Sequence, residues 1–235
     1  EYELWLLENK KGAQPRQVTF NSSAWKYQPV WSPDSRFLLF SDRTLKLRLV
    51  EASTGKITDI DHATASELRS YNFSPDSRWI TYQKEGSNEK AAIWVYDITS
   101  GKRQQVTDGT FSDDNPVFSL DGNYIFFASN RDFNLSFSSF DFDYIYDKAT
   151  RLYAISLTPK SPKIFKDKND IEPVKAEKTT SVPTVSAKDK KGKSSTADTS
   201  SVKKEVRVEI DFNGINDRIT ALPGEAGEYR IVGMA

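Results

Sequence analysis

Short apolar runs separated by turn-forming residues fill most of this 235-residue chain. The runs at 37–40, 79–82 and 124–127 are almost continuously apolar or aromatic, instead of alternating with polar residues. A short continuous run between turn signals indicates a strand covered on both faces, because neither face is kept polar for water. The pattern therefore predicts an all-β protein whose sheets are stacked between neighbouring sheets.

Each of these runs ends one copy of a ten-residue motif. The copies are "WSPDSRFLLF" at 31–40, "FSPDSRWITY" at 73–82 and the looser "FSLDGNYIFF" at 118–127. Proline presets φ for the second position of a turn, and aspartate can accept a hydrogen bond from the backbone two residues further on, so the motif predicts a tight hairpin. We interpret its aspartates as turn formers, because catalysis does not require one carboxylate per repeat: Asp34, Asp76 and Asp121.

The repeat has the length and strand content of a β-propeller blade. The motif aspartates follow one another at spacings of 42 and 45 residues. Further strands are predicted at 45–53, 54–60, 91–99, 100–107 and 151–157. Periods of about 40–45 residues with four short strands each are typical of propeller blades, so we expect a β-propeller fragment of about three four-stranded antiparallel blades.

Both ends of the chain carry parts of further blades. Residues 4–19 have the pattern of the last two strands of a blade, and residues 228–235 that of the start of another. Because a propeller ring closes with about four to eight blades, we expect the natural polypeptide to be longer on both sides.

Residues 166–204 break the strand pattern. Lys, Ser, Thr and Asp dominate there and no aromatic residue occurs, so the segment cannot bury enough apolar surface to offset its ordering entropy. We predict propeller blades at 1–165, a disordered low-complexity insertion at 166–204, and a return to the propeller at 205–235. Strands are expected to resume at "VRVEIDF" (206–212) and "DRITALP" (217–223). The insertion is interpreted as a solvated linker, with docking of an acidic partner to its lysines as the alternative.

A second elaboration, "RDFNLSFSSFDFDYIYDKAT" at 131–150, separates the second and third strands of the same blade. Loops on rigid scaffolds often carry function, and aromatic residues mixed with acids suit a contact surface. Packing of these aromatic residues over the blade explains the same composition, so both interpretations stay open.

Charge and composition exclude several classes of partner. The 33 Lys and Arg residues balance 33 Asp and Glu residues, so no net field favours nucleic acid, and we predict no nucleic-acid partner. Cysteine is absent, which excludes disulfides, thiolate nucleophiles and Cys-ligated zinc. No apolar run approaches eighteen residues, so no membrane span is predicted.

Candidate catalytic groups are scarce. The single histidine, His62, lies in "DIDHATAS" between two blades, and no Gly-x-Ser-x-Gly motif occurs. The acid-rich "FSDDNP" and "DFDYIYD" lack the glycine of a calcium-binding loop, which leaves calcium there as a minor alternative. We therefore predict no catalytic, cofactor-binding or metal-ligating residue, and no cofactor, in these 235 residues.

Several segments resemble known propeller families. "PVWSPDSRFLLFSDR" (29–43), "YNFSPDSRWITY" (71–82) and "NPVFSLDGNYIFFASNRDF" (115–133) are similar to the repeats of TolB and tricorn propellers, a signature shared with prolyl-oligopeptidase propellers. Residues 130–157 and "VEIDFNGINDRITALPGEAGEY" (208–229) resemble a more specific region of bacterial tricorn-type proteases. Asn213 and Asn216 stand where that family usually has acids, and Ser35 and Ser77 replace the glycine of the turn.

This resemblance implies a non-catalytic propeller of a tricorn-like serine peptidase of the tail-specific class. Such enzymes are homo-oligomers with two propellers, a PDZ-like module and a catalytic domain, and their catalytic Ser and His would lie outside this chain. The implied role is to gate peptide substrates or products through a propeller channel. A TolB-like docking propeller and the lid of a prolyl-oligopeptidase-type hydrolase are the alternatives. We expect a cytoplasmic location, with a periplasmic or secreted one as the alternative.

Overall fold

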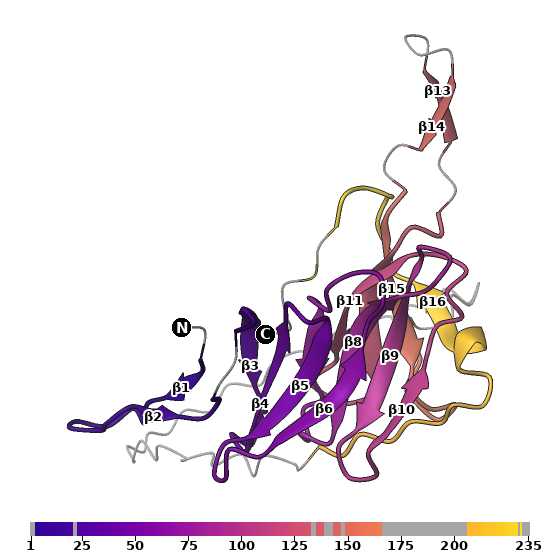
Figure 1. The fold of residues 1–235 in the computed structure, drawn as a ribbon. Coiled ribbons are helices and arrows are strands. Elements are labelled where there is room, and N and C mark those ends of the chain that lie inside the picture. The colour runs from indigo at the N-terminus through magenta and orange to yellow at the C-terminus, as the bar shows by residue number, and fades with distance from the viewer. Residues whose placement is uncertain are drawn as a thin grey trace, which may run out of the picture. The chain divides into compact units, whose positions relative to one another are not determined.

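The computed structural model describes residues 3–20, 23–132, 135–138, 143–146, 149–165, 206–229 and 231. The chain divides into two compact units, one formed by Glu1–Pro162 with Glu205–Ala235 and the other by Lys163–Lys204. Nearly all of the second unit falls outside the described residues, and so does the predicted disorder at 166–204. The first unit is built from antiparallel strands and contains three four-stranded sheets (Figure 1).

Each four-stranded sheet follows the order of the chain and corresponds to one predicted blade. Blade 1 contains β3 (Lys26–Trp31), β4 (Phe37–Asp42), β5 (Lys46–Glu51) and β6 (Ile57–His62). Blade 2 contains β7 (Tyr71–Phe73), β8 (Trp79–Glu85), β9 (Ala91–Asp97) and β10 (Lys102–Gln105). Blade 3 contains β11 (Asp113–Phe118), β12 (Tyr124–Ser129), β15 (Arg151–Ser156) and β16 (Ile219–Ala221). The predicted fold class, a propeller fragment with four-stranded antiparallel blades, is confirmed.

The three motif copies form the same turn. In each copy the carbonyl of the motif serine accepts a hydrogen bond from the backbone N–H three residues later, at 2.9 Å in the first two copies and 3.0 Å in the third. The donating residue has a left-handed φ, 61° for Ser35, 59° for Ser77 and 73° for Gly122. Glycine adopts this conformation freely, whereas a side chain crowds the following carbonyl. The first two blades therefore hold a serine under backbone strain where the third has glycine.

The motif aspartates stabilise these turns. One carboxylate oxygen of Asp34 accepts hydrogen bonds from the Ser32 hydroxyl at 2.6 Å and from the Arg36 backbone N–H at 3.0 Å. Asp76 and Asp121 accept the equivalent pair in their own turns. Bonds of this kind satisfy backbone groups that the hairpin leaves unpaired. The structure thus shows the turn-forming role that the recurrence of these residues predicted.

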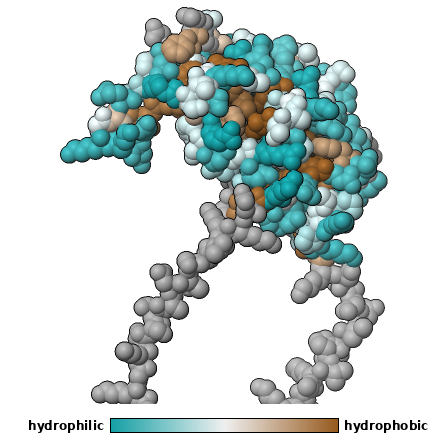
Figure 2. Space-filling view, turned by 90° about the horizontal axis from the view of Figure 1, so that it is seen from below, coloured by the Kyte–Doolittle hydropathy of each residue, from teal (hydrophilic) through white to brown (hydrophobic). Residues whose placement is uncertain are grey.

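Alternate residues of the continuous apolar runs enter different cores. Leu39 packs between blades 1 and 2 in a cluster with Tyr82, whereas Leu38 and Phe40 face the opposite side of blade 1. Blade 2 shares another cluster with blade 3, which includes Trp79. On the face shown in Figure 2, hydrophobic residues gather between bordering hydrophilic ones. Blade 2 is therefore covered on both faces, as the continuous runs predicted.

Two small sheets accompany the blades. Before blade 1, β1 (Trp5–Leu6) pairs with β2 (Arg16–Gln17), and these are the two strands expected within 4–19. Between the second and third strands of blade 3, β13 (Leu135–Ser138) pairs with β14 (Asp143–Tyr146). The exposed fractions of Leu135 and Phe137 are 39% and 58%. These two side chains of the 131–150 elaboration are therefore substantially exposed to solvent.

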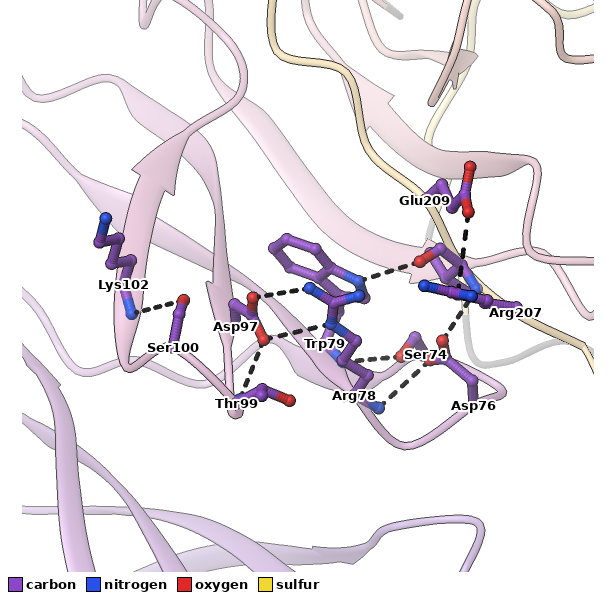
Figure 3. A network of polar contacts seen from close by, with 11 residues as sticks. Ser74, Asp76, Arg78, Trp79, Asp97, Thr99, Ser100, Lys102, Arg207 and Glu209 are labelled. Atoms are coloured by element: carbon purple, nitrogen blue, oxygen red, sulfur yellow. Dashed lines mark hydrogen bonds and ion pairs between the residues drawn. The ribbon is translucent and has the colours of Figure 1, made fainter.

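The prediction of a strand at 206–212 is wrong. Val206–Phe212, called the strap below, pairs with no strand among the described residues, because β16 already holds the fourth position of blade 3. The Val208 N–H donates to Asp76 Oδ2 at 2.8 Å, and the Val208 carbonyl accepts from Trp79 Nε1 at 3.2 Å (Figure 3). The strap's central peptide groups thus bind side chains of blade 2 in place of a β-ladder.

The strap leads into a 3₁₀-helix, η1 (Ile215–Arg218), and then into β16. Ile215 is buried in the core shared by blades 2 and 3. The Arg218 guanidinium donates to the carbonyls of Ser156 at 2.9 Å and Asn213 at 2.7 Å. The "DFNGINDRI" segment therefore ties the return of the chain to β15, and its arginine has a structural use.

Candidate functional site

A pocket of about 320 Å³ lies along the first strands of all three blades. Its wall is formed by residues 28–30 of β3, residues 69–72 around β7, residues 115–117 of β11, and Ile231. The first strand of a propeller blade is the one nearest the central channel. This site, called the inner pocket below, is therefore where a propeller presents its channel wall.

Uncharged hydrogen-bonding side chains occupy one level of this wall. Gln28, Ser70 and Asn115 each lie four residues before the motif serine of their blade. The Ser70 hydroxyl donates to Asn115 Oδ1 at 3.3 Å, which links blade 2 to blade 3 at this level. Asn72, two residues along β7, adds a further carboxamide to the pocket. The three blades thus place amide and hydroxyl groups around one cavity.

The backbone of two inner strands is bulged at the same level. Gln28 and Asn115 have φ of 41° and 52°, and both precede a proline. The pairing register with the second strand shifts at each of these points. A left-handed φ is uncommon for residues other than glycine, and the residue before proline favours extended conformations. The bulges interrupt the regular edge that each strand would otherwise present.

Tyr71 of blade 2 holds the bulge of blade 1. Its hydroxyl donates to the carbonyls of Tyr27 at 2.7 Å and Gln28 at 3.0 Å, and accepts from the Ser41 N–H at 3.2 Å. Burial raises the pKa of the Tyr71 phenol above its ordinary value, so the hydroxyl keeps the proton that it donates. The shape of the pocket wall is thus fixed by contact between neighbouring blades.

The charges at the pocket compensate one another. Among the described residues that line it, Arg69 is the one that carries a charge. Arg69 Nε donates to Glu67 at 2.8 Å, and its guanidinium lies 5.0 Å from the centre of the Tyr27 ring. Hydrogen bonds from Arg69 and then Tyr27 lower the pKa of Glu67, so this carboxylate stays charged beside the arginine. The pair adds little net field to the pocket.

The two acids of β11, Asp113 and Asp114, are buried and partly buried respectively. Asp113 is fully buried and accepts two hydrogen bonds from Arg131 Nη2, at 2.8 and 2.9 Å. Burial, followed by the charge of Asp113, raises the pKa of the neighbouring Asp114 carboxyl. The Asp113 carboxylate is thus paired with an arginine, and burial and the Asp113 charge both disfavour the charged form of Asp114.

The residues that the sequence singled out lie elsewhere. Asp34, Asp76 and Asp121 are used in turns, and His62 is exposed at the end of β6. Within the described ranges no group of three or more His, Asp or Glu side chains is arranged to hold a metal ion. The side chains of "DFDYIYD" fall outside those ranges. No helix among the described residues is long and apolar enough to cross a membrane.

Sequence reasoning missed the inner pocket. A signal was present, since "QPV" at 28–30 and "NPV" at 115–117 stand at equivalent places before two copies of the motif. In both places a residue other than glycine stands before a proline within the first strand of a blade. This recurrence was the sequence signal for the bulges.

Comparison with known proteins gives a consistent picture. The model of the family "Tricorn protease second beta propeller domain" matches residues 1–235. The tricorn protease of Thermoplasma volcanium is 29% identical over 155 residues, which cover 62% of this chain and 15% of that protein. Tricorn protease homolog 1 of Streptomyces coelicolor is 25% identical over 154 residues, 66% of this chain and 14% of that protein.

Among solved structures, the crystal structure of the tricorn protease matches with a TM-score of 0.67 and 19% identity, covering 93% of this chain and 19% of that chain. At this identity the match shows the fold. The chain spans about 15% of the length of the curated relatives that it matches.

Proposed function

Since this chain belongs to the family of tricorn protease second β-propeller domains, we propose that it is the non-catalytic propeller segment of a tricorn-like serine peptidase. It gates or guides peptides to or from a catalytic domain that lies outside these 235 residues. A homo-oligomeric parent protein and a cytoplasmic location are parts of the same proposal.

The observation that carries this proposal is the inner pocket. Its wall comes from the first strands of three consecutive blades, and apolar clusters pack blade 1 against blade 2 and blade 2 against blade 3. Close-packed sheets resist deformation, so we expect the wall that they form to keep its shape. An extended peptide can follow such a wall, whereas a folded domain is too wide for it. The propeller then selects by physical size.

The test is to narrow the pocket in the full-length protein that contains this chain. Asn72→Trp places an indole among the inner strands. We expect hydrolysis of long unfolded peptides to fall by about tenfold relative to hydrolysis of tripeptides, since binding and passage, not the chemical step, are impaired. Steady-state kinetics with both classes of substrate measure the ratio.

Thr58→Trp is the matched control, because Thr58 is exposed on β6, the last strand of blade 1. It should leave the ratio unchanged. An unchanged ratio in Asn72→Trp, with the variant correctly folded, would contradict gating. Loss of a protein partner in that variant without any change in hydrolysis would favour a docking propeller.

A further inference from the structure

The inner pocket offers hydrogen-bonding groups of the kind that peptide bonds complement. A carboxamide has an NH₂ donor and a carbonyl acceptor, and a peptide unit has one N–H and one C=O. Within the described part of the chain, the side chains of Gln28 and Asn72 make no hydrogen bond to protein groups. Asn115 uses its Oδ1 towards Ser70. Donors and acceptors therefore remain for a ligand on each of the three blades.

The same wall has little means of selecting by charge. Arg69 forms an ion pair with Glu67, and Asp113 forms one with Arg131. An uncompensated charge at contact distance would change the affinity for a charged ligand by more than about tenfold. Compensation removes this discrimination and leaves the neutral side chains as the groups that contact a ligand.

The inner strands are open at one edge but cannot form a continuous ladder with a peptide. Each of β3, β7 and β11 pairs with one neighbouring strand in its sheet, β4, β8 and β12 respectively. A flat free edge recruits an added strand through a row of backbone hydrogen bonds. Here the bulges at Gln28 and Asn115 break that row, and Tyr71 already occupies two carbonyls of blade 1. Single side-chain contacts then replace a cooperative β-ladder.

We infer that the inner pocket binds extended peptide segments through their backbone amides, regardless of side-chain charge, with Gln28, Asn72 and Asn115 as the hydrogen-bonding groups. This inference rests on the proposed function and specifies what the pocket recognises. Separate contacts to a repeating backbone let a chain advance by one residue at a time, because each new position presents the same groups. Diverse peptides can thus pass the same wall.

The experiment uses the full-length protein and photo-reactive peptides of about ten residues, long enough to span roughly 30 Å when extended. Neutral, acidic and basic versions are compared with a neutral version whose central amides are N-methylated. The readout is the yield of cross-links to residues 27–31, 69–73 and 114–118, mapped by mass spectrometry. We expect the three unmodified peptides to agree within about twofold, and N-methylation to lower the yield about fivefold through lost hydrogen bonds.

Variants test the residues themselves. Asn72→Leu and Gln28→Met keep the side-chain size and remove hydrogen-bonding groups, so each should lower the yield for all unmodified peptides by about threefold. Asn72→Asp is the matched control that adds one uncompensated charge, and it should favour the basic over the acidic peptide by about tenfold or more.

The outcomes separate this inference from the proposed function. Equal yields for N-methylated and unmodified peptides would overturn backbone recognition, while a changed hydrolysis ratio in Asn72→Trp would leave gating in place. A preference above about tenfold for one charge in the unaltered protein would overturn the neutrality of the pocket. Absence of cross-links to these strands, together with an unchanged ratio in Asn72→Trp, would contradict the proposed function as well.

Discussion

The junction between blades 1 and 2 and the junction between blades 2 and 3 are built differently around the same turn motif. At the first, the turns meet directly, since the Asp34 N–H donates to Ser77 Oγ at 3.0 Å. At the second, the strap intervenes and binds Asp76 and Trp79 through the peptide groups of Val208 (Figure 3). One motif can thus dock to its own repeat or to an unrelated segment.

The third copy of the motif is adapted to the strap. A Cβ on Gly122 would lie 2.9 Å from Val208 Cγ2 and 3.0 Å from Val206 Cγ1, so a side chain there would displace the strap. These distances lie well inside the optimal separation of two carbon atoms, about 3.5–4.0 Å, so the contacts would be repulsive. The looser sequence of this copy therefore has a packing reason, and the second junction depends on residues from two distant parts of the chain.

The largest expected effect comes from charging the centre of the strap. Val208 is fully buried, so Val208→Asp should destabilise the second junction by about 3 kcal/mol or more through an unpaired buried charge. Hydrogen exchange should show faster opening of blades 2 and 3 than of blade 1. Glu209→Asn, an exposed change in the same segment, is the control and should change little. Equal opening of all three blades would mean that the junctions are not independent.

Gly122→Ala should have the next largest effect on stability. The added Cβ collides with the strap, and the residue has φ of 73°, so we expect a loss of about 2 kcal/mol in the free energy of unfolding. Urea denaturation checks this value. Val208→Ala in the same background should recover part of the loss by removing the clashing methyl groups. Additive losses in the double variant would contradict direct contact.

Ser35 and Ser77, the two serines with a left-handed φ, allow the hydrogen bond at the first junction to be tested separately from backbone strain. Ser35→Gly should stabilise by about 0.5–1 kcal/mol, because glycine accepts the left-handed backbone. Ser77→Gly relieves the same strain but loses the bond from the Asp34 N–H. We expect it to be about 1 kcal/mol less stable than Ser35→Gly, and thermal unfolding measures the difference. Equal effects would show that the hydrogen bond between the turns contributes nothing.

The smallest effect concerns pH at the second junction. Asp97 accepts hydrogen bonds from Arg78, whose guanidinium lies 5.0 Å from the centre of the Trp79 ring. Burial alone raises the pKa of Asp97, but bonds from Arg78 and Thr99 outweigh it and the pKa is lowered. A lowered folded pKa gives stability that is present above the unfolded value of about 3.9 and is lost as pH falls through the folded one.

The stability advantage of the unaltered protein over Asp97→Asn should therefore be constant near neutral pH and shrink below about pH 4. Urea denaturation across this range measures it. A difference that instead grows as the pH falls would contradict the assigned shift.

The parts of the fold that depend on local pattern could be predicted from the sequence. The Ser-Pro-Asp turns and the continuous runs are local signals, and they located the blades correctly. The prediction of a strand at the strap was wrong because "VRVEIDF" alternates like a strand. The partners of the strap, Asp76 and Trp79, lie far away in the sequence. The inner pocket was missed because it forms where short, bulged strands of three blades meet, and no single repeat reveals that meeting. Pattern alone does not contain such long-range geometry.

The strap also affects the order in which parts of the chain can pack during synthesis. Its bonds to blade 2 join residues 129 and 132 positions apart. At about 5–20 residues per second, Trp79 leaves the ribosome roughly 6–26 seconds before Val208 is available to cover it. While the intervening chain is being synthesised, blade 2 lacks its contacts with the strap. Changing the length of the intervening chain would change the time for which Trp79 of a nascent chain lacks its partner Val208, even if the finished protein were the same.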